Sequence, residues 1–160
     1  VLDTYLKMLE TNGTVDFKTL MITGPFLSLE RLDELADRAR ALKVQIKPFV
    51  RNMEKRMAKS DLVVSMGGYN TMCEILSLKK AALIIPRDNP RQEQLIRARV
   101  FKEQGLCDYI RWGDVSPETM RKKINALLDD PSPYTSALDT FAMTGLQVMR
   151  ERLQYFRENC

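Results

Sequence analysis

The stretch from Ser60 to Pro86 constrains the fold more than any other part of the chain. An apolar, β-branched run over Asp61–Met66 leads into Gly67-Gly68, and residues 70–79 then repeat apolar side chains at the three-to-four spacing of a helix face. A second apolar run follows at Leu83–Pro86. The pattern predicts a buried strand, a glycine turn, a helix and a second buried strand, which is the building unit of a parallel α/β sheet.

The glycine pair lies where the first strand meets the helix. Glycine lets the backbone approach a ligand closely, and a helix that starts there directs free N–H groups toward that ligand. Such a helix start favours an anion, typically a phosphate. A glycine pair can also serve packing alone, so the turn by itself leaves both interpretations open.

Glu74 follows six residues after the second glycine, on the helix side that carries Asn70 and Thr71. A carboxylate there can accept hydrogen bonds from two neighbouring sugar hydroxyls, as the acidic residue of dinucleotide folds does with ribose. The alternative is that Glu74 only compensates the positive end of the helix dipole.

Composition excludes several classes of function. The 160 residues are 44% apolar and 29% charged, as expected for one globular domain, and no run approaches the roughly 18 apolar residues that span a bilayer. With no histidine, these residues can form no His-based triad, His general base or His-ligated metal site. Cys73, Cys107 and Cys160 lack metal-binding spacing, which predicts reduced thiols in the cytoplasm.

The net charge of +4 is modest, and the basic residues are interspersed with acids. No base-stacking aromatic residues lie among them, so the sequence predicts no nucleic-acid partner. An anionic membrane surface or a phosphate-bearing ligand fits the charge better.

Strand and helix patterns alternate along the whole chain. The predicted strands are Phe17–Thr23, Val44–Val50, Asp61–Met66, Leu83–Pro86 and Cys107–Arg111. The predicted helices are Leu2–Leu9, Leu29–Leu42, Met53–Lys59, Asn70–Lys79, one that Asn89-Pro90 begins and Gly105 ends, Ser116–Leu128, and a last one from about Ser136 to Arg157. We therefore expect an α/β fold, a Rossmann-like parallel sheet with helices on both faces. Ligands of such sheets bind beyond the carboxyl ends of the strands, the side on which both Gly67-Gly68 and Glu93-Gln94 fall.

The chain opens on a helix, whereas a doubly wound domain usually opens on a strand. This predicts a single domain over residues 1–160 whose first strand is missing, with about residues 134–160 as a C-terminal helix. It would then be a fragment of a longer protein.

A family resemblance covers about Phe17–Leu128. The segments PFVRNMEKRMAKSDLVVSMGGYNTMCE, from Pro48 to Glu74, and IIPRDNPRQEQLIRA resemble the C-terminal, donor-binding domain of GT-B glycosyltransferases. They are similar to the peptidoglycan UDP-N-acetylglucosamine transferase family and to bacterial predicted glycosyltransferases with a GYNT motif. Residues 68–74, GYNTMCE, also resemble the G-W-N-S-x-x-E signature of plant-type glucosyltransferases.

The resemblance implies a substrate-binding role for each matching position. The base pocket would comprise Phe49, Val50 and Met53; the diphosphate would contact Gly67, Gly68, Tyr69, Asn70 and Thr71; the ribose would bind Glu74; and the donor sugar would bind Glu93 and Gln94. Arg87 and Arg91 have no fixed family role and are equally consistent with a diphosphate partner or a solvated face. Simple strand core is the alternative for Phe49 and Val50, and a solvated helix surface is the alternative for Glu93 and Gln94.

The chain also departs from the family pattern. Met66 stands where plant-type enzymes have histidine, and the N-terminal acceptor domain, which carries the family's catalytic base, is absent from these residues. The resemblance therefore implies that residues 1–160 are a single nucleotide-sugar-binding domain, a fragment of a two-domain enzyme, with no catalytic residue here, no metal and no cofactor. Because one sheet strand and the acceptor domain are missing, we expect the isolated fragment to be inactive and prone to self-association. The resemblance further implies a bacterial, cytoplasmic protein, with peripheral contact at the inner face of the membrane left open.

These observations together predict the donor-binding domain of a glycosyltransferase that moves a hexosyl or N-acetylhexosaminyl group from a UDP- or dTDP-linked sugar to an acceptor hydroxyl. Two alternatives remain from the sequence. One is a non-catalytic α/β nucleotide-binding or regulatory module. The other is a nucleotide-sugar epimerase or hydrolase on the same fold.

Overall fold

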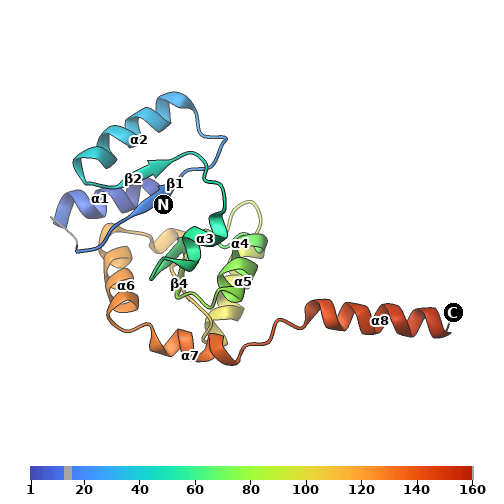
Figure 1. Cartoon of the computed structure of the whole chain (residues 1–160). Coiled ribbons are helices and arrows are strands. Elements are labelled where there is room, and N and C mark those ends of the chain that lie inside the picture. The colour runs from blue at the N-terminus through green and yellow to red at the C-terminus, as the bar shows by residue number, and fades with distance from the viewer. Residues whose placement is uncertain (13–15, 160) are drawn as a thin grey trace.

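The computed structural model describes residues 1–12 and 16–159, and its elements follow the predicted alternation (Figure 1). The strands are β1 (Leu20–Ile22), β2 (Gln45–Lys47), β3 (Val63–Ser65), β4 (Ala82–Ile84) and β5 (Asp108–Tyr109). The helices are α1 (Leu2–Asn12), α2 (Leu29–Ala41), α3 (Met53–Ala58), α4 (Tyr69–Ser77), α5 (Glu93–Glu103), the short 3₁₀ helix η1 (Trp112–Asp114), α6 (Pro117–Asp129), α7 (Ser132–Thr140) and α8 (Gly145–Asn159).

All described strand pairs are parallel, which confirms the predicted fold class. The strands nevertheless form two sheets, one of order β1-β2 and one of order β3-β4-β5. In register, Met21 faces Ile46 in the first sheet, and Val64 faces Leu83 in the second. No strand pairing joins β1 to β3 among the described residues.

One buried cluster holds the two sheets together. Met21 of β1 and Leu83 of β4 belong to it, together with Leu6 of α1, Leu35 of α2 and Ile124 of α6. A second cluster, which includes Ile84 of β4, covers the opposite side of the β3-β4-β5 sheet with residues of α3, α4 and α5. Helices thus pack on both faces, as a doubly wound arrangement requires.

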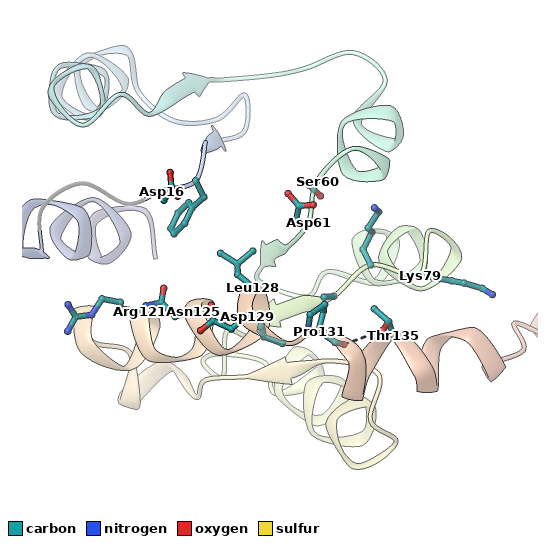
Figure 2. Close-up of a pocket in the computed structure, with 14 residues that line it drawn as sticks. Asp16, Ser60, Asp61, Lys79, Arg121, Asn125, Leu128, Asp129, Pro131 and Thr135 are labelled. Carbon is teal, nitrogen blue, oxygen red and sulfur yellow. Dashed lines mark hydrogen bonds between the residues drawn. The ribbon is translucent and has the colours of Figure 1, made fainter.

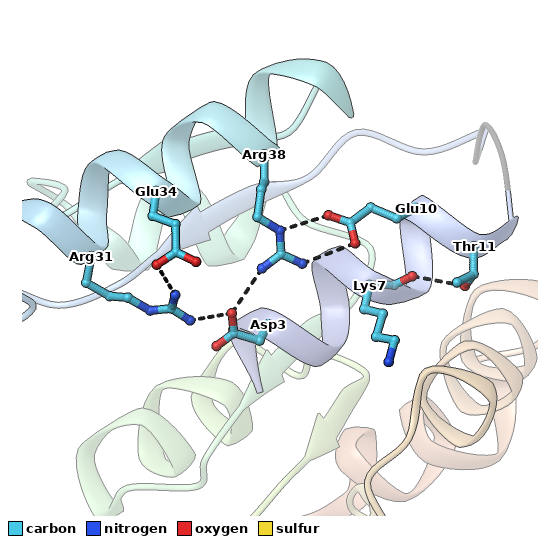
Figure 3. Close-up of polar contacts among 7 residues, drawn as sticks. All are labelled: Asp3, Lys7, Glu10, Thr11, Arg31, Glu34 and Arg38. Atoms are coloured by element: carbon cyan, nitrogen blue, oxygen red, sulfur yellow. Dashed lines mark hydrogen bonds and ion pairs between the residues drawn. The ribbon is translucent and has the colours of Figure 1, made fainter.

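Ion pairs fasten α1 to α2 (Figure 3). The Arg38 guanidinium donates to Glu10 at 2.8 Å and to Asp3 at 3.0 Å, and Arg31 bridges Asp3 and Glu34. The hydrogen bond from Arg31 holds the pKa of Asp3 below its usual value. The face of α2 that carries Arg31 and Arg38 therefore meets α1.

The observed strands are shorter than the predicted ones. The run Val44–Val50 ends as a strand at Lys47, because Pro48 has no N–H to donate to a ladder. The expectation that Asp61–Met66 is a fully buried strand was wrong, since Val64 is 36% exposed. Its strand, β3, lies at an edge of its sheet.

Two helix predictions also need correction. Asn89-Pro90 does not begin α5, whose first residue is Glu93 with Gln92 at the N-cap. The residue before a proline is disfavoured in helical conformation, and the chain bends at Asn89-Pro90 instead. The predicted last helix from Ser136 to Arg157 is two helices, α7 and α8, separated by residues 141–144.

The last helix, α8, projects away from the body of the molecule (Figure 1). Its Leu146, Met149, Leu153 and Phe156 are all more than half exposed and recur at the spacing of one helix face. Among the described residues, none of the helices is both long and apolar enough to cross a membrane.

Candidate functional site

The turn at Gly67-Gly68 has the geometry that a phosphate site needs. Gly68 is the N-cap of α4, and no side chain caps that helix end. The first turn of α4 contains no acidic residue, so no side chain of that turn neutralises the partial positive charge of the helix start. This arrangement favours an anion in front of α4.

The two glycines differ in their backbone conformation and in the space that surrounds them. Gly67 adopts φ +74°, and a Cβ on it would lie 2.7 Å from Cγ2 of Ile84. Gly68 has φ −56°, and a Cβ there would meet nothing within 4 Å. Gly67 is therefore required by the backbone and by packing, whereas Gly68 keeps open the space before the helix.

A residue that the sequence analysis missed secures this turn. Arg97 of α5 donates from Nη1 to the carbonyl oxygen of Gly67 at 2.8 Å, and its guanidinium lies 5.7 Å from the centre of the Tyr69 ring. The amide of Gly67 in turn donates to Oγ of Ser65 at 3.1 Å. One signal was available, because Arg97 lies one helical turn after Glu93 and so shares its side of the helix.

Residue Glu74 lies beyond the first turn of α4, as the sixth residue after the N-cap. This position removes the interpretation that it neutralises the helix start. It lies on the same side of α4 as Asn70, a side that is not fully buried. Thr71 is half-buried and Tyr69 is 68% exposed.

The beginning of α5 lies at the same edge as the glycine turn, because Arg97 joins the two. Oε1 of Gln94 accepts a hydrogen bond from the backbone N–H of Arg87 at 3.0 Å, so Gln94 is more than a solvated surface residue. Its amide NH₂ has the capacity to donate to a ligand as well. Glu93, Arg87 and Arg91 are exposed.

The proposed base-pocket residues occupy the connection from β2 to α3. Phe49 is 66% exposed, which excludes the strand-core alternative for it, whereas Val50 is buried as that alternative requires. Met53 packs against the cluster that contains Met72 of α4 and Ile84 of β4. The structure thus places Met53 on the glycine-turn side of the molecule and leaves Phe49 open to solvent.

One cavity lies away from this edge. A cavity of about 830 Å³ opens at the amino ends of the strands, between Phe17, Asp61 and Leu128 (Figure 2). Within the described ranges, no three carboxylate or thiol side chains cluster closely enough to hold a metal ion.

Comparison with known proteins gives the family. The glycosyltransferase family 28 C-terminal domain matches residues 3–152. A UDP-N-acetylglucosamine–N-acetylmuramyl-(pentapeptide) pyrophosphoryl-undecaprenol N-acetylglucosamine transferase from Bacillus cereus is 29% identical over 131 residues, which are 80% of this chain and 35% of the relative. The corresponding enzyme of Methylobacterium radiotolerans is 28% identical over 111 residues, 69% of this chain and 30% of the relative. The chain therefore spans about a third of the length of these relatives.

Solved structures agree on the fold. MurG of Acinetobacter baumannii superposes with a TM-score of 0.74 at 16% identity, over 96% of this chain and 45% of MurG. The glycosyltransferase VinC, solved in complex with dTDP, gives a TM-score of 0.67 at 20% identity, over 87% of this chain and 32% of VinC. The chain belongs to the glycosyltransferase family 28 C-terminal domain family.

Proposed function

We propose that residues 1–160 form the donor-binding domain of a glycosyltransferase that moves a hexosyl or N-acetylhexosaminyl group from a nucleotide diphosphate sugar to an acceptor hydroxyl. The observation that carries this proposal is the uncapped start of α4 behind Gly67-Gly68, held in place by Arg97. The names of the relatives support a nucleotide-sugar donor, since they specify UDP-N-acetylglucosamine.

Each part of the site has a role in this proposal. The free N–H groups of Gly68, Tyr69, Asn70 and Thr71 hold the diphosphate and stabilise the charge that develops on it as the sugar leaves. Glu74 accepts hydrogen bonds from the ribose hydroxyls. The base lies against Phe49, Val50 and Met53; the sugar contacts Glu93 and Gln94; and Arg87 and Arg91 add positive charge at the same edge.

The remaining machinery lies outside these residues in this proposal. A separate acceptor domain closes the cleft, excludes water and supplies the base that deprotonates the acceptor hydroxyl. The reaction is a direct displacement that needs no metal ion. The enzyme acts in the cytoplasm in this proposal.

A panel of nucleotides tests the proposal in a protein that includes the acceptor domain. A ligand at 100 times its dissociation constant stabilises its protein by about 2.7 kcal/mol, which a thermal shift detects. We expect stabilisation by UDP or dTDP and by the matching nucleotide sugar. Stabilisation by a nucleotide without any sugar transfer would favour the non-catalytic module, and no stabilisation by any nucleotide would contradict donor binding.

Replacing Glu74 by alanine should weaken binding of the nucleoside diphosphate by about 1–3 kcal/mol, because the ribose hydroxyls lose their acceptor. Titration calorimetry measures the change directly. Glu103→Ala, at the far end of α5 and exposed, is the matched control and should bind as the parent does. Equal affinities for the parent and for Glu74→Ala would remove Glu74 from the site.

Replacing Gln94 by glutamate should separate its two roles. Glutamate keeps the oxygen that accepts from the Arg87 N–H but loses the NH₂ that would donate to a sugar hydroxyl. We expect roughly tenfold weaker binding of the nucleotide sugar, the loss of about 1.4 kcal/mol, and a smaller loss for the free diphosphate, which only the added negative charge affects. Equal losses for both ligands would assign Gln94 a purely structural role.

A further inference from the structure

Arg97 directs its charge at the backbone of the glycine turn. Its Nη1 donates to the carbonyl oxygen of Gly67 at 2.8 Å. Glu93 lies four residues earlier on α5, the spacing at which a glutamate and an arginine commonly pair on a helix surface. Within the described residues, however, Arg97 forms no ion pair with Glu93 or with any other carboxylate. The guanidinium charge is therefore placed on a carbonyl group of the turn rather than on an acidic side chain.

The ring of Tyr69 helps to hold the guanidinium in this position. The central carbon of the guanidinium lies 5.7 Å from the ring centre, and Tyr69 is the first residue of α4. A guanidinium stacked on an aromatic ring has less freedom to rotate, so its N–H stays aimed at the carbonyl oxygen. Arg97 thus contacts the residue before the N-cap Gly68 and the residue after it.

The peptide unit between Gly67 and Gly68 carries this contact to the helix start. In a trans peptide the C=O and the following N–H lie in one plane and point in opposite directions. Because Arg97 holds the oxygen, the N–H of Gly68 is directed away from Arg97. In the part of the chain that the structure describes, this N–H donates to no protein group. It is one of the free donors at the start of α4.

Two adjacent glycines make this contact consequential, because a peptide plane between them can rotate at little steric cost. The peptide before Gly67 is held by its own N–H, which donates to Oγ of Ser65 at 3.1 Å. The peptide after Gly67 is held at its oxygen by Arg97. A charged donor on that oxygen also polarises the peptide and makes the N–H at its other end a stronger donor.

We propose that Arg97 is a positioning residue of the donor site, which sets the direction of the Gly68 N–H and strengthens it as a donor to the diphosphate of the nucleotide sugar. This inference rests on the proposed donor-binding function. The guanidinium acts through the intervening peptide and does not itself contact the ligand. Loss of Arg97 should therefore release the Gly67–Gly68 peptide and weaken diphosphate binding together.

Two measurements test this role in the protein that includes the acceptor domain. Relaxation of ¹⁵N-labelled glycine amides reports on Gly68 without any ligand, and titration calorimetry gives the affinities for UDP and dTDP. Arg97→Met removes the donor and the charge but keeps an unbranched stem, whereas Arg97→Lys keeps both a donor and the charge. Arg99→Met, at an exposed position on the same helix, is the matched control for the loss of one positive charge.

We expect the Gly68 amide to have an order parameter of about 0.85 in the parent and in Arg99→Met, and below about 0.6 in Arg97→Met. Arg97→Met should also bind the nucleoside diphosphate at least about tenfold more weakly, because a preorganised donor is lost. Arg97→Lys should recover most of both losses. The amide of Gly105, just after α5, should be unchanged in every variant and so shows that the fold is intact.

A rigid Gly68 amide in Arg97→Met, or a mobile one with unchanged diphosphate affinity, would overturn the proposal. An equal loss of affinity in Arg99→Met would also overturn it, because Arg97 would then act only as a general positive charge. If the parent binds no nucleotide, the donor-binding function itself is contradicted. That failure is visible in the parent, whereas failure of the role of Arg97 is visible only in its variants, so the two are distinguishable.

Discussion

Replacing Gly67 by alanine is expected to destabilise the domain by about 2–5 kcal/mol, because strain and overpacking act together. A left-handed conformation costs an L-residue roughly 1–2 kcal/mol, and an extra methyl group forced into a packed site costs about 1–3 kcal/mol more. At Gly67 φ is +74°, and the new Cβ would lie 2.7 Å from the side chain of Ile84. Urea unfolding at pH 7 measures the loss.

The neighbouring glycine provides the control. Gly68→Ala introduces no contact within 4 Å and needs no unusual φ, so stability should change by less than about 1 kcal/mol. Its methyl group would instead occupy the open space before α4, and the proposed diphosphate should bind more weakly. Equal losses of stability for the two variants would show that the structural difference between these glycines has no energetic consequence.

Replacing Asp108 by asparagine should cost about 2–4 kcal/mol, because the carboxylate connects three elements from a nearly buried position. It accepts from Lys102 of α5 at 3.0 Å and from Lys123 of α6 at 2.7 Å, with its side chain only 11% exposed. The lysines are more than a third exposed and can be hydrated when the carboxylate is lost, which keeps the cost below that of a fully buried pair.

The effect of Asp108→Asn should depend on pH in a defined direction. Burial alone would raise the pKa of Asp108, but hydrogen bonds from Lys123 and Lys102 outweigh it and hold the pKa below its ordinary value of 3.8. The stabilisation is therefore complete above the unfolded-state pKa and is lost as the pH falls through the lower folded-state pKa. Unfolding free energies of parent and variant should differ most near neutral pH and converge in strong acid.

The matched control for Asp108 is Asp139→Asn on the surface. Asp139 also lies 3.0 Å from a lysine, Lys79, but its side chain is 68% exposed. Exposed pairs contribute up to about 1 kcal/mol, so this variant should remain close to the parent. A loss at Asp139 equal to that at Asp108 would contradict the role assigned to burial.

Much of the fold could be predicted because the relevant signals are local. The Ser116-Pro117 start of α6 forms the expected cap, with Oγ of Ser116 accepting from the N–H of Thr119, and Gly105 ends α5 with a positive φ. The predictions failed where local signals were ambiguous. Asn89-Pro90 has the residue types of a helix start but lies in a bend before α5, and residues 141–144 divide a helix that looked continuous in sequence.

The candidate site was predicted less completely than the fold. The turn at Gly67-Gly68 and the position of Glu74 on α4 follow from spacing along the chain. Phe49 is exposed rather than part of a strand core, and Arg97 was not identified at all. Arg97 could not be singled out among the basic residues, because its role depends on a carbonyl group thirty residues away.

The sequence by itself determined the order of helices and strands, their parallel α/β class and the glycine turn, because periodicity, capping and turn chemistry act between residues close in the chain. Only the tertiary structure decided that Arg97 holds Gly67, that Lys102 and Lys123 converge on Asp108, and that the strands divide into two sheets. Those outcomes depend on which distant elements lie side by side. That arrangement follows from the packing of all the apolar faces at once and is not encoded in any single segment.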